Sequence, residues 1–135
     1  NQAHPAAIAR EAIDLSPARL SDSTFPGLDA FETAFADLPA GTPVIFVFPP
    51  QHISFLPEPG SAIWRDVKTC KNDVMNRVAA HDGWHYLDFL IDMPETRDPA
   101  NFIDGDHYRA GLARMIETRL VGILRPSGPP ALSEK

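Results

Sequence analysis

Hydrophobic positions along the chain change between helical spacing and short unbroken apolar runs. Helical spacing predicts helices over residues 5–13, 28–38, 61–80 and 108–124, and an unbroken apolar run predicts a strand at residues 44–48. A second strand is predicted at residues 84–90, with Leu87 and Phe89 as packed positions. The run Val-Ile-Phe-Val-Phe at residues 44–48 is apolar on both faces, which is typical of a strand buried in a parallel sheet. Ser61 is a suitable N-cap for the helix that follows, whereas Pro39 and Gly41 end the helix that precedes this strand.

The predicted order of elements is helix, helix, strand, helix, strand, helix. This order is typical of a parallel α/β sheet with right-handed crossovers and helices on its faces. Because two strands make a poor sheet, we expect further strands from an upstream segment or another chain; failing that, residues 15–25 would form an irregular edge. Residues 1–124 are thus predicted to form one α/β domain, as the C-terminal portion of a larger fold. Residues 125–135, rich in Pro, Ser and Gly, are predicted to form a flexible tail.

Composition narrows the function classes without choosing one. The chain has 135 residues, a net charge of -6 and a pI near 5.2, which argue against nucleic-acid or anionic-membrane binding. No window approaches the roughly 20 apolar residues of a membrane span. The single cysteine, Cys70, lies in a helical pattern with Val67 and Val74, which favours a buried structural thiol; the nearby Lys68 and Lys71 would lower the pKa of a reactive one.

Side chains that could take part in catalysis lie in the two polar loops that follow the predicted strands. His52 and Ser54 lie in the loop of residues 49–60, and Asp104 and His107 lie near the end of the loop that begins at residue 92. In parallel sheets such loops meet at the carboxyl edge, so we expect His52, Asp104 and His107 to converge. A carboxylate three residues before a histidine fixes its tautomer and stabilises the imidazolium, which suits His107 as a general base.

Each of these residues also has a structural interpretation. Asp106, or else Asp104, is expected to cap the last helix, and Arg109 to form an ion pair with Asp106 or a substrate anion. His107 and His52 are also consistent with ordinary surface and loop histidines. The remaining alternative is a metal site built from His52, Asp104, Asp106 and His107. No HExxH or CxxC spacing supports it, so we predict no metal and no cofactor.

The run Asp104-Gly105-Asp106-His107 resembles the DxxH block of SGNH (GDSL) hydrolases and their acyltransferase relatives. The longer run at residues 102–109 resembles that of bacterial SGNH-like proteins, and so do the run at 47–52, Trp64 and the segment 87–89. The resemblance covers roughly residues 40–122, the C-terminal half of such a domain. It implies a three-layer α/β/α, flavodoxin-like fold, with His107 as general base and Asp104 as its orienting carboxylate. We expect His52, Tyr108 and Arg109 to contact the substrate.

The family's serine nucleophile lies in a Gly-Asp-Ser-like turn, and neither this turn nor a Gly-x-Asn-Asp block occurs in the chain. We therefore expect the nucleophile to come from an upstream segment or a separate polypeptide; Ser54 is the best local candidate. The implied function is hydrolysis or transfer of an ester-linked acyl group, carbohydrate esters included, at an extracytoplasmic location. The alternative is a non-catalytic binding or assembly domain of the same fold.

Overall fold

The computed structural model describes residues 19–125, so the predicted helix over residues 5–13 and the predicted tail from residue 126 onward lie outside the described residues. The described elements are α1 (Pro26–Phe35), β1 (Val44–Phe48), η1 (Ile53–Phe55), α2 (Ala62–Ala80), β2 (Trp84–Asp88), α3 (Pro94–Arg97), η2 (Pro99–Asn101) and α4 (Ala110–Leu124). No helix in this part of the chain is both long and apolar enough to cross a bilayer.

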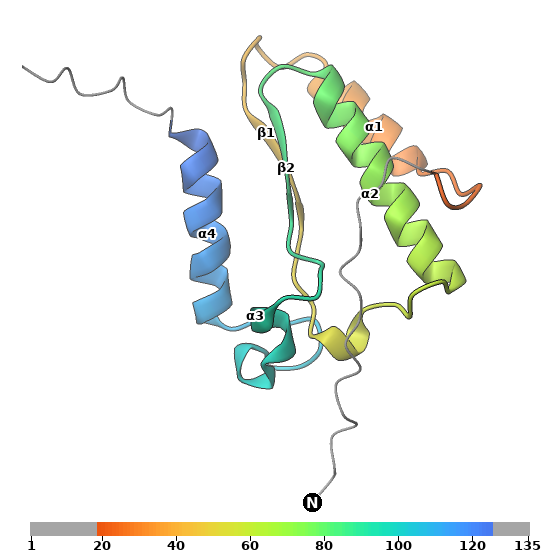
Figure 1. Cartoon of the computed structure of the whole chain (residues 1–135). Helices are drawn as coiled ribbons and strands as arrows, with labels where there is room; N and C mark the ends of the chain where they lie inside the picture. The colour runs from red at the N-terminus through yellow and green to blue at the C-terminus, as the bar shows by residue number, and fades with distance from the viewer. Residues whose placement is uncertain (1–18, 126–135) are drawn as a thin grey trace, which may run out of the picture.

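The strands β1 and β2 form a parallel pair, in register from Val44 opposite Trp84 to Phe48 opposite Asp88. Helices α1 and α2 lie on one side of this pair and α4 lies on the other (Figure 1). The predicted α/β class and the parallel pairing are therefore confirmed. The three-layer flavodoxin-like architecture stays a prediction, because the sheet formed by residues 19–125 has only the two strands.

Burial of β1 on both faces was a wrong prediction. Val47 is 37% exposed, and the other residues of the strand are only half-buried. The physical reason is that β1 has a neighbouring strand on one edge only within the described residues. The edge and part of one face of an apolar strand are therefore left open to solvent.

Helix α1 is shorter and more exposed than its pattern predicted. It begins at Pro26, as suits a proline in the first turn, and ends at Phe35 rather than near Leu38. Pro39 disfavours helical backbone at Leu38, so the helix does not extend to the predicted end. None of its residues is buried, and Phe31 is 53% exposed.

Helix α2 follows the prediction closely, and its burial reveals one unexpected residue. The Ser61 hydroxyl caps it by accepting the Trp64 backbone N–H. Lys71 is fully buried, and its Nζ donates to both carboxylate oxygens of Asp88 at 2.8 and 2.7 Å and to the Leu90 carbonyl at 2.7 Å. Because the Asp88 side chain is only 7% exposed, this ion pair fixes α2 to the end of β2, where the chain turns toward the loops described below.

The Cys70 thiol is half-buried rather than buried. Burial, followed by the charge of Asp73, raises the pKa of this thiol against the opposing effect of Lys71. The two lysines therefore do not create a thiolate of lowered pKa. This result agrees with a structural thiol rather than a reactive one.

The polar loop predicted to begin at residue 92 contains the short helices α3 and η2. Pro94 and Pro99 lie in the first turns of these short helices, a placement that their fixed φ favours. Thr96 is buried, and its hydroxyl accepts the Met93 backbone N–H while donating to backbone carbonyls. Both prolines therefore begin helical turns within the predicted loop.

Candidate functional site

The two loops that follow the carboxyl ends of β1 and β2 meet, and a backbone hydrogen bond links them. The His52 N–H donates to the Gly105 carbonyl at 2.8 Å, so the loop after β1 is tied to the loop that carries the Asp-Gly-Asp-His run. Between them lies a pocket of about 240 Å³ lined by His52, Ser54, Phe55, Pro99, Phe102, Ile103, Asp104 and Gly105. The structure therefore brings His52 and Asp104 to one pocket, as the topology of a parallel sheet predicts, whereas His107 is not among the residues that line it.

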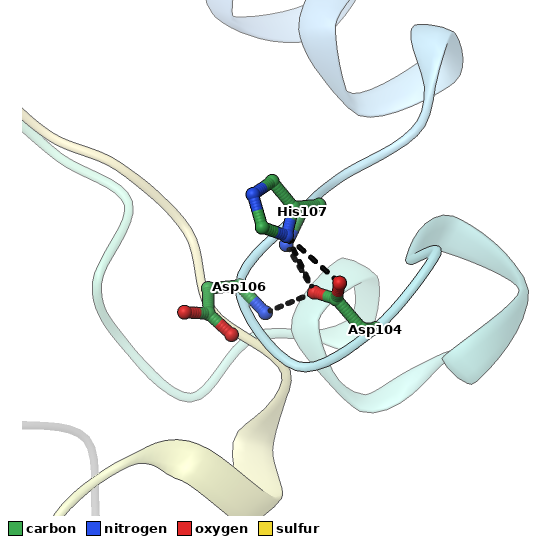
Figure 2. Close-up of side chains that lie close together, drawn as sticks. All are labelled: Asp104, Asp106 and His107. Atoms are coloured by element: carbon green, nitrogen blue, oxygen red, sulfur yellow. Dashed lines mark hydrogen bonds and ion pairs between the residues drawn. The ribbon is translucent and has the colours of Figure 1, made fainter.

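Asp104 and His107 form a close pair beside this pocket (Figure 2). The Nδ1 atom of His107 lies 2.8 Å from both carboxylate oxygens of Asp104. A carboxylate at this distance requires Nδ1 to carry the proton, which leaves the lone pair of a neutral imidazole on Nε2. The side chains of His107 and Asp104 are 73% and 56% exposed, so the pair is open to a substrate. His107 Nε2 has no hydrogen-bond partner among residues 19–125.

The backbone around this pair forms a narrow loop that holds its shape with local hydrogen bonds. Phe102 and Tyr108 form an antiparallel bridge, and the Ile103 N–H donates to the His107 carbonyl at 2.7 Å. Inside this loop, Asp104 Oδ1 accepts the backbone N–H groups of Asp106 at 3.1 Å and His107 at 2.9 Å. The backbone of the loop therefore helps to position the carboxylate that contacts the imidazole.

Helix capping by Asp106 was a wrong prediction. Helix α4 begins at Ala110, its N-cap position is Arg109, and no side chain caps it. Asp106 lies too early in the chain for that role, because the loop continues through the bridge at Tyr108. Asp104 does bind backbone N–H groups, but those of its own loop.

Arg109 does not form the predicted ion pair with Asp106. Its Nε donates instead to the Phe102 carbonyl at 2.9 Å, and its backbone N–H donates to the Asn101 carbonyl at 2.7 Å. Tyr108 is half-buried in the bridge. Both residues therefore support the loop, and substrate contact by either stays a prediction.

The Asp104–His107 contact shifts the pKa of both groups. The pKa of Asp104 is lowered, first by the His107 backbone N–H and then by the His107 side chain. The pKa of His107 is raised above 6.5 by its hydrogen bond to Asp104 and by the negative charge of that carboxylate. Both shifts favour an imidazolium–carboxylate pair, the state that follows proton transfer to His107.

Three of the four residues considered as metal ligands lie close together in the structure. One ligand atom each from Asp104, Asp106 and His107 lie within 4.8 Å of one another, and all three residues are exposed. Nδ1 of His107 is engaged by Asp104, and Nδ1 of His52 is engaged by Ser54. Exposed acidic groups often cluster without an ion, so we assign no metal to this group.

His52 and Ser54 form the second polar pair of the pocket. The Ser54 hydroxyl lies 2.7 Å from His52 Nδ1, and the Ser54 backbone N–H donates to the same nitrogen at 3.3 Å. The ring of His52 packs edge-on against Phe102, with centroids 5.6 Å apart. Within residues 19–125, no serine hydroxyl is hydrogen-bonded to His107. Ser54 as the nucleophile of that histidine stays a prediction that this hydrogen bonding does not support.

Phe55 and Phe102 were not predicted as site residues, yet both line the pocket. The sequence held a signal for Phe102, which lies inside the run that resembles SGNH-like proteins. Phe55 gave no such signal, because its role depends on contact with Gly105, fifty residues away in the chain.

Gly105 is expected to be a sensitive position in the pocket. A Cβ atom built there would lie 1.9 Å from Cε2 of Phe55, so this ring, which is 57% exposed, would have to move. We expect Gly105→Ala to displace this ring and to lower the free energy of unfolding by about 1–3 kcal/mol in urea titrations.

Gly122→Ala is the matched control, because a Cβ there meets nothing within 4 Å and the position lies inside α4. We expect this substitution to stabilise the chain by about 0.5–1 kcal/mol through higher helix propensity. Equal effects of the two substitutions would show that the Phe55–Gly105 contact does not constrain the pocket.

Comparison of the chain with protein-family models, with curated proteins and with solved structures finds no match. A function is therefore proposed from the geometry of the site and from the resemblance of its residues to the DxxH block of SGNH hydrolases.

Proposed function

We propose that this chain supplies the acid–base pair of an SGNH-like esterase or O-acyltransferase. A serine O–H attacks the carbonyl carbon of an ester, and its proton passes to Nε2 of His107. Asp104 holds Nδ1–H and stabilises the imidazolium. The imidazolium then gives its proton to the departing alcohol oxygen, leaving an acyl-serine. Water or a second alcohol, activated in turn by His107, completes hydrolysis or transfer.

The observation that carries this proposal is the contact of both Asp104 oxygens with His107 Nδ1. This contact fixes the ring in the tautomer that a base acting through Nε2 requires. The meeting of the two strand-end loops supports it further, because ligands of open α/β sheets bind at that edge.

The nucleophile in this proposal is a serine from outside residues 19–125. The same segment, or a second chain, is proposed to add strands to the sheet, whose described strands pair only with each other. The proposed substrates are acyl esters, carbohydrate-linked ones included, and the proposed location is the cell envelope outside the cytoplasm. Both follow from the resemblance to SGNH-like proteins.

The competing function is that of a non-catalytic binding or assembly domain. The observation in its favour is that no serine hydroxyl of the described residues is hydrogen-bonded to His107. In such a domain the Asp104–His107 pair would serve only to hold the loop.

The pH dependence of His107 tests the proposed base. Because its pKa is raised, the base form is present only at a pH above that raised value, so the acid limb of activity is expected above pH 6.5. NMR titration of the imidazole is expected to give the same midpoint. Asp104→Asn removes the largest cause of the shift, although the charge of Asp106 remains, and is expected to move the midpoint down toward 6.5.

An unchanged His107 midpoint in Asp104→Asn would contradict the coupling on which the base depends. Glu117→Gln, an exposed change on α4, is the matched charge control and should leave the midpoint in place.

A further inference from the structure

We infer that His52 is a substrate-positioning residue, whose Nε2–H donates a hydrogen bond to the carbonyl oxygen of a short, neutral acyl ester in the pocket. This inference deepens the proposed function and rests on it for the identity of the ester. It concerns the histidine that lines the pocket, which the acid–base chemistry of Asp104 and His107 does not use.

The first step is the tautomer of His52. Its Nδ1 accepts the Ser54 backbone N–H at 3.3 Å, and a backbone N–H can only donate. Nδ1 therefore carries no proton, and the Ser54 hydroxyl at 2.7 Å donates to it as well. A neutral imidazole with a bare Nδ1 has its proton on Nε2. Ser54 thus fixes His52 as a donor through Nε2, which has no hydrogen-bond partner among the described residues.

The second step is the contrast between the two histidines beside the pocket. His107 is fixed by Asp104 with its proton on Nδ1 and a lone pair on Nε2, so it accepts. His52 is fixed the opposite way. An ester needs both functions, because its nucleophile must lose a proton while its carbonyl oxygen gains negative charge. The Asp104–His107 contact therefore gives the site an acceptor, and the Ser54–His52 contact gives it a donor. Among residues 19–125, Asp104 is the only carboxylate that lines the pocket, and no lysine or arginine lines it.

The third step is the size and polarity of the pocket. Its volume of about 240 Å³ is below the roughly 300–1,000 Å³ of pockets that hold drug-sized ligands, so it suits a small group. Phe55, Phe102 and Ile103 provide apolar walls, while the Asp104 carboxylate disfavours an anionic ligand. A neutral acyl group of a few carbons meets both conditions.

The tautomer is tested directly by nitrogen-15 NMR of the imidazole side chains at a pH where both histidines are neutral. The expected result is a protonated Nε2 and a bare Nδ1 for His52, and the reverse for His107. A proton on Nδ1 of His52, or a mixture of both tautomers, would overturn the inference. This measurement needs no variant and no catalytic activity.

Binding is tested with butyramide, a neutral short acyl carbonyl that resists hydrolysis, by following the Nε2 signal of His52 during titration. Glutamine places a side-chain N–H near the position of Nε2, whereas asparagine places its polar atoms near Nδ1. We therefore expect His52→Gln to retain binding and His52→Asn to weaken it roughly fivefold, as loss of one neutral hydrogen bond predicts.

His52→Phe keeps the ring against Phe102 without nitrogen and should resemble His52→Asn. Equal binding by all three variants would overturn the donor role, and so would no binding by the unsubstituted protein. Octanamide is expected to bind no better than butyramide, and tighter binding would contradict a short acyl group.

The two proposals fail separately in these experiments. Loss of butyramide binding with an intact His107-dependent serine would overturn only the role of His52. Binding at His52 in a protein without a reactive serine would leave the pocket as a ligand site and remove the esterase.

Discussion

Lys71→Met is expected to lower the free energy of unfolding by about 3–5 kcal/mol, the usual result of removing one partner from a buried ion pair. Lys71 is fully buried, and its Nζ is bound to Asp88 and to the Leu90 carbonyl. Methionine keeps the apolar stem but leaves the Asp88 carboxylate without its cation. Burial already raises the pKa of Asp88 against the effect of Lys71, so the unpaired carboxylate would be more costly still. Urea unfolding measures the change.

Lys68→Met is the matched control for this substitution. Lys68 lies three residues earlier on α2, and its Nζ lies 4.6 Å from the centre of the Trp64 ring, a contact that is expected to contribute about 0.5–1 kcal/mol. The double variant Lys71→Met with Asp88→Asn should regain most of the loss, because the charge is removed while the Leu90 backbone N–H keeps an acceptor. Similar losses for the two lysine variants would contradict a structural role for the buried pair.

His107→Ala is expected to lower kcat/KM for a short acyl ester by about 10²–10⁴-fold in the natural protein, because a positioned general base contributes that much. The KM should change little, since the base acts on the serine rather than on the bound acyl group. Asp104→Asn should lose a comparable factor, because an uncharged amide neither orients the imidazole nor stabilises the imidazolium.

His81→Gln is the matched histidine control for this measurement. His81 ends α2, where its ring stacks on Trp84 and bonds to Glu32, away from the pocket residues. Activity of this variant should match that of the unsubstituted protein. Retention of full activity by a folded His107→Ala protein would contradict the assignment of the base.

Local sequence rules predicted the elements whose stabilising contacts are themselves local. The Ser61 cap and the apolar spacing along α2 both involve residues within a few positions of each other, and the helix forms there. The parallel pairing of β1 with β2 was also predicted, although its contacts are not local, because the strand–helix–strand order favours it. Burial was less predictable, because the exposure of Val47 depends on whether another strand lies beside β1.

The buried ion pair was not predicted, although the position of Lys71 in the sequence indicated a buried charge. Lys71 lies four residues after Val67 and three before Val74, so it shares their apolar face of α2. A charged side chain on such a face needs a partner, and Asp88 ends the next strand. No rule from the sequence gave the pairing itself, because it depends on how α2 packs across β2.

The candidate site was predictable at the level of topology. Loops that follow parallel strands meet at one edge, which brought His52 to the same pocket as Asp104. The finer chemistry was not predictable, because it depends on hydrogen bonds that fix the loops. Asp106 was expected to cap α4, but the Phe102–Tyr108 bridge delays the helix to Ala110.

Fluorophosphonate labelling of the natural protein, read by intact mass and peptide mapping, tests the proposed acid–base pair most directly. We expect one serine outside residues 19–125 to be labelled, and the labelling rate to fall about 10²–10⁴-fold in His107→Ala. A label on Ser54 would move the nucleophile into the pocket beside His52. No label on a folded protein, or a rate that His107→Ala does not change, would contradict the esterase and favour a binding domain.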